Sequence, residues 1–113
     1  MGLDMYWELP KGILHPRFIP PLFLINCWTM EDGSLTFGDY SVDLFLLSGI
    51  PMHTKYISKS SVKRISELFD KTDHDKFLKA NPVLEDTSLE EWNDLKRMFE
   101  AYTKIGGRIR VSW

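Results

Sequence analysis

Apolar and polar residues alternate at both ends of the chain. The first such stretch reads Leu3, Asp4, Met5, Tyr6, Trp7, Glu8 and Leu9. At the other end, Ile109 and Val111 alternate with Arg108 and Arg110. A period of two places successive side chains on opposite faces of a β-strand. The pattern therefore predicts one strand at about residues 2–9 and another at residues 108–113.

The polar faces of these two strands carry opposite charges. Asp4 and Glu8 lie on the first, and Arg108 and Arg110 on the second. Opposite charges that face each other across a strand ladder contribute about 0.2–1 kcal/mol per pair. We therefore expect the two ends of the chain to be neighbours in one sheet.

A hairpin is expected in the first half of the chain. Three prolines in residues 13–21 each fix the backbone and remove a donor, which indicates an irregular connection. Residues 22–30 are apolar on both faces, and residues 35–40 follow after the turn residues Asp32 and Gly33. This order predicts two strands joined by a turn at Asp32-Gly33.

Two shorter segments are less distinctive. Residues 41–48 fit a short helix that is capped by Ser41 and stopped by Gly49, and they fit a strand as well. Periodicity does not separate these alternatives in so short an apolar run. Residues 52–58 are expected to form a short strand.

Three helices are predicted in the second half. Residues 59–71 carry one apolar stripe, and Asp73 is expected to cap a short helix that runs to Ala80, before Asn81-Pro82. The longest helix begins at Ser88, which forms an S-x-x-E capping box with Glu91, and runs to about Lys104. Its apolar stripe consists of Trp92, Leu95, Phe99 and Tyr102, and Gly106-Gly107 provide a left-handed stop.

These elements predict a single α+β domain over residues 1–113. The length of 113 residues is enough for one domain with a single hydrophobic core and is short for two domains. We expect a small antiparallel or mixed sheet in which the N- and C-terminal strands are adjacent. The helices at 59–71 and 88–104 are expected to pack on one face of it.

Composition narrows the class of protein. The 43% hydrophobic and 27% charged residues are typical of globular domains and argue against disorder. Cys27 is the single cysteine, so no intramolecular disulfide is possible, which favours a reducing compartment. The first residues lack the basic character of a signal peptide, and the most apolar stretch, residues 18–30, is interrupted by prolines. We expect a cytoplasmic protein that does not enter a membrane.

The charge balance and the motifs give little support to catalysis. A net charge of −2 argues mildly against both a nucleic-acid binder and a DNA mimic. The aromatic residues fit the apolar stripes of the predicted core, so we do not interpret them as a platform for stacking bases. No phosphate-binding loop, nucleophile elbow or metal-ligand spacing is present in the sequence. Cys27 has no basic neighbour in sequence, which indicates an inert thiol in the core. We therefore assign no catalytic residue, no metal ligand and no cofactor.

The isolated histidines and the aspartates near residue 73 fit structural roles better than metal binding. His15, His53 and His74 have no ligand-like spacing. The run from Asp70 to Asp75 lacks the glycine and the frame of a calcium loop, and helix capping explains its carboxylates better.

One basic cluster is a candidate binding site. It consists of Lys55, Lys59, Lys63 and Arg64, which we call the basic junction because it lies between the strand and the helix predicted there. Free backbone amides at a helix start, hydroxyls and nearby bases favour an anion or an acidic surface. The alternative is a solvated helix face. We prefer the basic junction to the acidic stretch 85–94, because Glu91 already has a capping role.

The opening residues Met1-Gly2-Leu3-Asp4-Met5-Tyr6 resemble those of small proteins encoded by tailed bacteriophages and prophages. The closing Ser112-Trp113, the Tyr56–Lys59 segment before a helix and the pair Leu95-Lys96 are similar in order, whereas residues 10–55 depart from that group. The resemblance implies a binder of a host protein or of a defence-system protein, which it inhibits by direct contact. The alternatives are a module that sequesters a small anionic ligand, such as a nucleotide signal, and an enzyme whose site is hidden by the sequence order.

Overall fold

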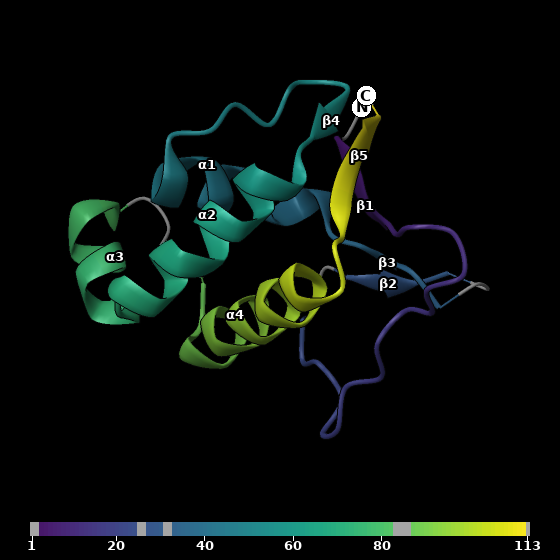
Figure 1. Ribbon diagram of the computed structural model, residues 1–113. Coiled ribbons are helices and arrows are strands. Elements are labelled where there is room, and N and C mark those ends of the chain that lie inside the picture. Colours follow the sequence, from purple (N-terminus) through teal and green to yellow (C-terminus); the bar gives the residue numbers. More distant parts are fainter. Residues whose placement is uncertain (1–2, 25–26, 31–32, 83–86, 113) are drawn as a thin grey trace.

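The computed structural model describes residues 3–24, 27–30, 33–82 and 87–112. Within them, one antiparallel sheet has the spatial strand order β2-β3-β1-β5-β4 (Figure 1). Its strands are β1 (Asp4–Glu8), β2 (Trp28–Thr29), β3 (Leu35–Thr36), β4 (Tyr56–Ile57) and β5 (Arg108–Ser112). The helices are the 3-10 helix η1 (Gly38–Tyr40) and the α-helices α1 (Ser41–Ser48), α2 (Lys59–Lys71), α3 (His74–Ala80) and α4 (Leu89–Lys104). The α+β class predicted from the sequence is confirmed.

The two end strands pair at the centre of the sheet, as predicted. Every residue of β1 has a partner in β5, and Glu8 lies opposite Arg108. Arg108 Nε donates to the Glu8 carboxylate at 3.0 Å, and Arg108 Nη2 lies 2.9 Å from the same oxygen. Arg110 Nη1 lies 4.0 Å from the other oxygen of Glu8. Asp4 faces no arginine, because the antiparallel register places Ser112 opposite it.

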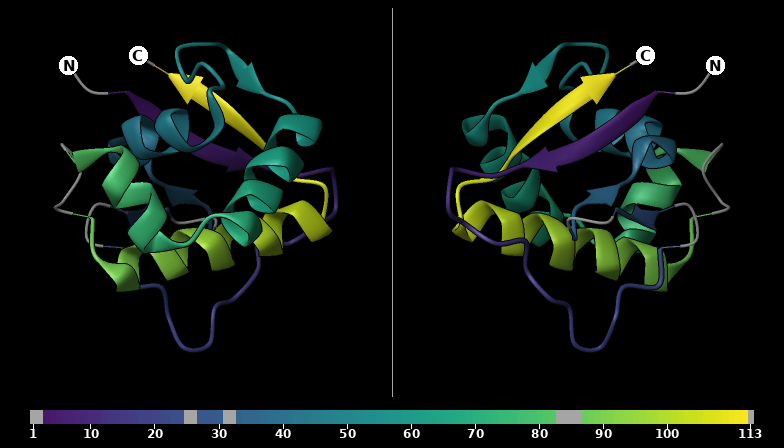
Figure 2. Two further views of the ribbon diagram at one scale, coloured as in Figure 1. Left: turned by 90° about the vertical axis from the view of Figure 1, so that its left-hand side faces the viewer. Right: turned by 90° about the vertical axis from the view of Figure 1, so that its right-hand side faces the viewer.

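The core lies between the sheet and the helices α2 and α4, which cover one face as expected. In the right-hand view of Figure 2, β1 and β5 lie in front of the helices, and no described helix crosses them. The inward side chains of these strands are buried: Met5, Trp7, Ile109 and Val111. The Trp7 ring stacks on Tyr102 of α4, with a centroid distance of 4.2 Å and an interplanar angle of 3°. It also stacks on Phe37, at 5.2 Å. Trp7 is therefore the contact between the central strand and the long helix.

Side-chain caps define where α2, α3 and α4 begin, and the predicted bounds are confirmed. Ser58, Asp73 and Ser88 each accept the backbone N–H of the residue three positions later. Glu91 completes the capping box by accepting the N–H of Ser88 at 3.3 Å. After α4, Gly106 adopts a left-handed φ of 77°, while Gly107 does not.

Residues 41–48, which fit either a helix or a strand in the sequence analysis, form the helix α1. Its left-handed stop at Gly49 is confirmed by a φ of 72°. Ser41 is the first residue of α1 rather than its cap, and the N-cap residue is Tyr40. The Tyr40 hydroxyl donates to Glu91 Oε2 at 2.6 Å, so the start of α1 is tied to the start of α4.

The predicted hairpin is much shorter than expected. Among the described residues of 22–30, the strand consists of Trp28–Thr29 alone, because the Phe23 N–H donates to a carboxylate of α4 rather than to a neighbouring strand. After β3 the chain turns into η1 at Gly38, where a Cβ would stand 1.7 Å from the Leu3 carbonyl oxygen. Phe37 still donates its N–H to the Met5 carbonyl at 3.0 Å, and residues 38–40 leave the sheet as η1.

The turn and the fourth strand also differ from expectation. Asp32 lies outside the described residues, whereas Gly33 has a φ of 89° and the Met30 N–H donates to the Ser34 carbonyl at 2.7 Å. Of the strand expected at 52–58, Tyr56 and Ile57 pair with β5. Ser58 cannot extend this strand, because it caps α2.

Replacement of Trp7 by alanine is expected to destabilise the domain by about 3–5 kcal/mol, the usual cost of removing a large buried ring. A loss of this size is a large part of the total stability of a small domain, which is about 5–15 kcal/mol. Trp28→Ala is the matched control, because Trp28 is 60% exposed on β2, and a change within about 0.5 kcal/mol is expected there. Urea denaturation followed by circular dichroism measures both. Equal losses in the two variants would contradict the assignment of Trp7 as the central core contact.

Candidate functional site

The residues of the basic junction are all exposed, but the structure does not gather all four. Lys55 precedes β4, and Lys59, Lys63 and Arg64 lie on the first two turns of α2. Lys63 and Arg64 take part in no ion pair within the described part of the chain. Whether these side chains bind a partner stays a prediction.

Arg108 of β5 joins half of this cluster. Its guanidinium lies 4.2 Å from the centre of the Tyr56 ring, and Lys55 Nζ lies 5.7 Å from the same ring. Lys59 and Arg108 also line one hollow of about 470 Å³, together with Glu8, Leu9, Pro10 and Gly106. The sequence indicated Arg108 only as a partner of β1, because the contact with Tyr56 depends on the pairing of β4 with β5.

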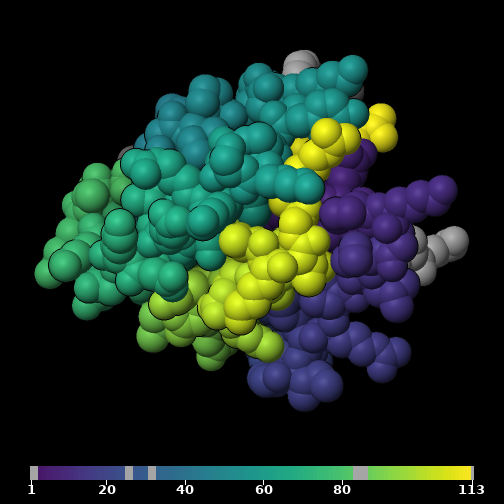
Figure 3. Space-filling view, in the orientation of Figure 1, coloured from purple at the N-terminus to yellow at the C-terminus, as the bar shows by residue number. Residues whose placement is uncertain are grey.

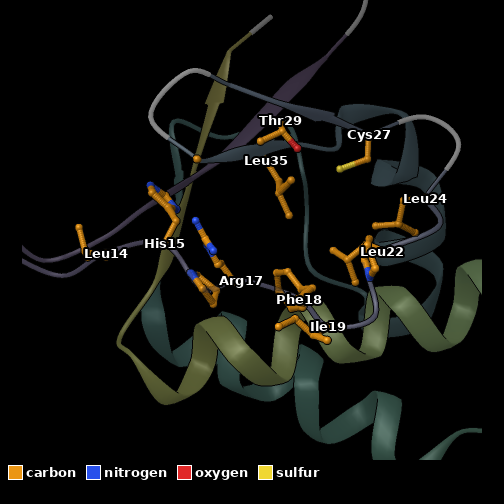
Figure 4. A pocket seen from close by; sticks show the side chains of 13 residues that line it. Leu14, His15, Arg17, Phe18, Ile19, Leu22, Leu24, Cys27, Thr29 and Leu35 are labelled. Atoms are coloured by element: carbon orange, nitrogen blue, oxygen red, sulfur yellow. The ribbon is translucent and has the colours of Figure 1, made fainter.

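A larger cavity lies elsewhere, between the β2–β3 hairpin and the segment that precedes it. Its volume is about 620 Å³, and we call it the loop pocket. Figure 4 shows Cys27, Thr29 and Leu35 on the hairpin side, and Phe18, Ile19 and Leu22 on the side next to α4. His15 and Arg17 lie at one end of the pocket and Leu24 at the other. Most of the lining is therefore apolar, with two nitrogen-bearing side chains at one end.

Side chains of α4 hold the segment that forms the floor of the loop pocket. Arg97 donates to the Pro20 carbonyl at 2.6 Å and pairs with Asp94 at 3.0 Å. Asp94 also accepts the Phe23 N–H at 2.5 Å. Near the other end of the segment, His15 Nδ1 and the Tyr102 hydroxyl form a hydrogen bond of 3.0 Å. These contacts satisfy backbone and side-chain polar groups, so the pocket is held open by a defined structure.

Two large apolar side chains of the pocket point into solvent. Leu14 is 86% exposed and Ile19 is 88% exposed. In Figure 3 the purple-to-blue segment before the hairpin stands out at the right and lower edges of the molecule. Sequence reasoning missed this site, since residues 13–21 were interpreted as a plain connection. The sequence feature that could have indicated this site is the presence of large apolar residues between prolines, because no regular helix or strand can bury them there.

Cys27 lies in the wall of the loop pocket rather than in a strand. The side chain is half-buried, and burial raises the pKa of its thiol to about 11. At neutral pH the thiol is therefore protonated. This agrees with the expectation of an unreactive cysteine, although its location was predicted wrongly.

Two buried carboxyl groups lie between α1 and the start of α4, and both have structural partners. Asp43 accepts the Thr87 hydroxyl at 2.6 Å, and Glu91 accepts the Tyr40 and Ser88 groups described above. Burial is the main cause of a raised pKa at Asp43, and the nearby charge of Glu91 acts in the same direction. These carboxyl groups tie α1 to the N-terminus of α4.

The histidines and the aspartates near residue 73 have structural contacts as well. His74 Nε2 lies 2.7 Å from the Thr87 carbonyl oxygen, and Asp70 pairs with Lys96 at 3.5 Å. In the described ranges, histidine, cysteine and carboxylate side chains do not cluster as metal ligands would. Among the same residues, no helix is long and apolar enough to span a membrane.

Cys27 is expected to react slowly with maleimide in the folded protein. Relative to an ordinary thiol of pKa 9.0, a pKa of about 11 lowers the thiolate population at pH 7 about 100-fold. Part of this is offset by the higher intrinsic reactivity of a more basic thiolate, so labelling at least about tenfold slower than in the unfolded chain is expected. Equal rates with and without guanidinium chloride would show that the thiol is open and activated.

Asp43→Asn is expected to raise the melting temperature at pH 7. A carboxyl whose pKa is raised on folding is disfavoured in its charged form, so the wild-type protein loses stability as pH rises through that pKa. The amide keeps an acceptor for Thr87 and carries no charge. The gain should be several degrees at pH 7, the effect of about 1 kcal/mol in a small domain, and should vanish as pH falls towards 3.8. Asp39→Asn, at the exposed position of η1, is the control and should change nothing; an identical rise there would contradict the assignment.

No protein-family model matches the chain, and neither do any of the curated proteins or solved structures with which it was compared.

Proposed function

We propose that this protein is a non-catalytic binding protein that holds another protein at its loop pocket. The observation that carries the proposal is the pair of large apolar side chains, Leu14 and Ile19, which stand almost fully exposed beside a cavity of about 620 Å³. Exposed apolar surface next to a concavity is typical of interaction sites. Phe23, in the same segment, is also 62% exposed.

The chemistry of the pocket favours an apolar anchor from a protein partner. A partner side chain that enters the pocket would be surrounded by Phe18, Leu22 and Leu35. Burial of apolar surface is favourable by roughly 25 cal/mol per Å². Arg97 and Asp94 already hold the floor of the pocket, so little of this gain would be lost in ordering the loop.

The nature of the partner follows from the resemblance to phage-encoded proteins. We propose that the partner is a host protein or a bacterial defence-system protein, and that occupation of the pocket inhibits it. The opening and closing residues, which are similar to those of the phage group, support this proposal. The carboxyl groups of Asp43 and Glu91 are engaged in contacts between helices, which supports a binding role over a catalytic one.

Aspartate substitutions at Leu14 and Ile19 test the proposal. The chain is used to capture a partner from bacterial lysate, the captured protein is purified, and its affinity is measured by calorimetry. Leu14→Asp and Ile19→Asp should each weaken binding at least about tenfold, since a charge at the rim opposes burial of the anchor. Leu89→Asp is the matched control, because Leu89 is 55% exposed at the start of α4 and does not line the pocket.

All variants should keep the wild-type melting temperature, since the substituted side chains are exposed. Full affinity in both pocket variants would contradict the proposed site. A captured protein that the wild-type chain and the Leu14→Asp/Ile19→Asp double variant retain equally would contradict it as well.

A further inference from the structure

The outer face of the sheet, opposite the helices, carries a row of aligned side chains. Directly paired residues of neighbouring antiparallel strands point to the same face. Trp28 pairs with Thr36, Thr36 with Tyr6, Tyr6 with Arg110, and Arg110 with Tyr56. The row therefore crosses all the strands in the order Trp28, Thr36, Tyr6, Arg110, Tyr56, and we call it the outer row.

The outer row alternates aromatic and polar residues. Its aromatic members lie on the first, third and fifth positions of the strand order, so successive rings are about 10 Å apart at the usual strand spacing. Trp28 is 60% exposed, and Tyr6 and Tyr56 are half-buried. Their inward neighbours in β1 and β4, such as Trp7 and Ile57, fill the core instead. Tyr6 thus faces outward as the alternation of residues 3–9 predicts, whereas Trp28 and Tyr56 face outward contrary to the expectation that the aromatic residues belong to the core stripes.

Cations gather at the Tyr56 end of the row. Arg108 lies over the Tyr56 ring at 4.2 Å, and Lys55 lies 5.7 Å from its centre. Lys59 borders the hollow that Arg108 lines. Against these bases and Arg110, the outer face holds two carboxylates: that of Glu8, which pairs with Arg108 and Arg110, and that of Asp4. The local charge is positive although the whole chain carries −2.

We propose that the outer row binds single-stranded nucleic acid, with bases on its aromatic rings and phosphates on its cations. Single strands expose the faces of their bases, and aromatic side chains on an open sheet are a common platform for them. A duplex is a poor fit, because its bases are stacked inside and its grooves admit protruding elements rather than a flat sheet. The positive charge complements phosphate, and Tyr6 and Tyr56 on either side of Arg110 place stacking surfaces beside it.

The binding is expected to be salt-dependent and free of strong sequence preference. Contacts from about three cations predict a slope near −2 in a plot of log affinity against log salt, by the relation for single strands. The expected affinity is modest, because the net charge of −2 provides no long-range attraction. This surface does not include the loop pocket, so the proposal goes beyond the protein-binding function above and fails or succeeds separately from it.

The test is fluorescence anisotropy of the full chain with labelled oligothymidylate and oligouridylate of about 12 nucleotides, from about 50 to 200 mM salt. Saturable binding with the expected slope is predicted. Tyr56→Ala and Arg110→Ala should each weaken it at least about fivefold. Trp28→Ala should weaken it while leaving the fold unchanged, since the ring is 60% exposed, and Trp28→Phe should restore it. This pair keeps the test decisive if a tyrosine variant does not fold.

The matched controls are Lys71→Ala, an exposed base at the end of α2, and Phe45→Ala, a ring on α1 that is 46% exposed. Both should bind like the wild-type chain. Four results would overturn the proposal: no saturable binding at the lowest salt, binding that survives Trp28→Ala, equal competition by duplex DNA or a polyglutamate peptide, and equal affinity for uridine monophosphate. The last would identify a small anionic ligand site instead of a strand-binding surface.

Discussion

The antiparallel pairing of β1 with β5 is the constraint on which the rest of the structure depends. These strands come from opposite ends of the chain and occupy the centre of the sheet, with β3 added to one side and β4 to the other. The ladder is continuous from Asp4 to Glu8, and the Glu8–Arg108 contact closes its end. Without this pairing the sheet would separate into two smaller parts, neither large enough to bury the apolar face of α4.

Both candidate surfaces derive their position from this central pair. Inward, Trp7 stacks on Tyr102 of α4, and the hydroxyl of the same Tyr102 bonds to His15 beside the loop pocket. One end of the pocket is thus connected to the core through Tyr102. Outward, the pairing places Tyr6 beside Arg110, which completes the alignment from β2 to β4. One ladder therefore organises an apolar site on one side of the molecule and an aromatic, basic face on the other.

Polar contacts fix the remaining elements to α4. The helix receives α1 through the Tyr40–Glu91 and Asp43–Thr87 contacts near its start, and it receives the proline-rich segment through Asp94 and Arg97. Short, buried or half-buried hydrogen bonds of this kind define geometry more than they add stability, because each replaces a bond to water. They explain how a segment without regular structure forms a defined cavity.

The sequence by itself determined the elements whose signals are local. The starts of α3 and α4 were predictable because Asp73 and Ser88 bind a backbone N–H only three residues away. The start of α2 was predictable from its apolar stripe, whereas its cap Ser58 was expected to belong to the preceding strand. The two end strands were predictable because their alternation and charge are carried by a few adjacent residues. The basic junction was visible for the same reason, although its contact with Arg108 was not.

Only the tertiary structure decided the lengths of the middle strands, the loop pocket and the outer row. The strand expected over residues 22–30 is short because Phe23 bonds to Asp94, a residue 71 positions away along the chain. The loop pocket requires the hairpin and the segment before it to meet above α4, and the outer row requires a particular register between all neighbouring strands. Such alignments are set by side chains that are distant in sequence, and a one-residue shift in register would turn every ring of a strand to the opposite face.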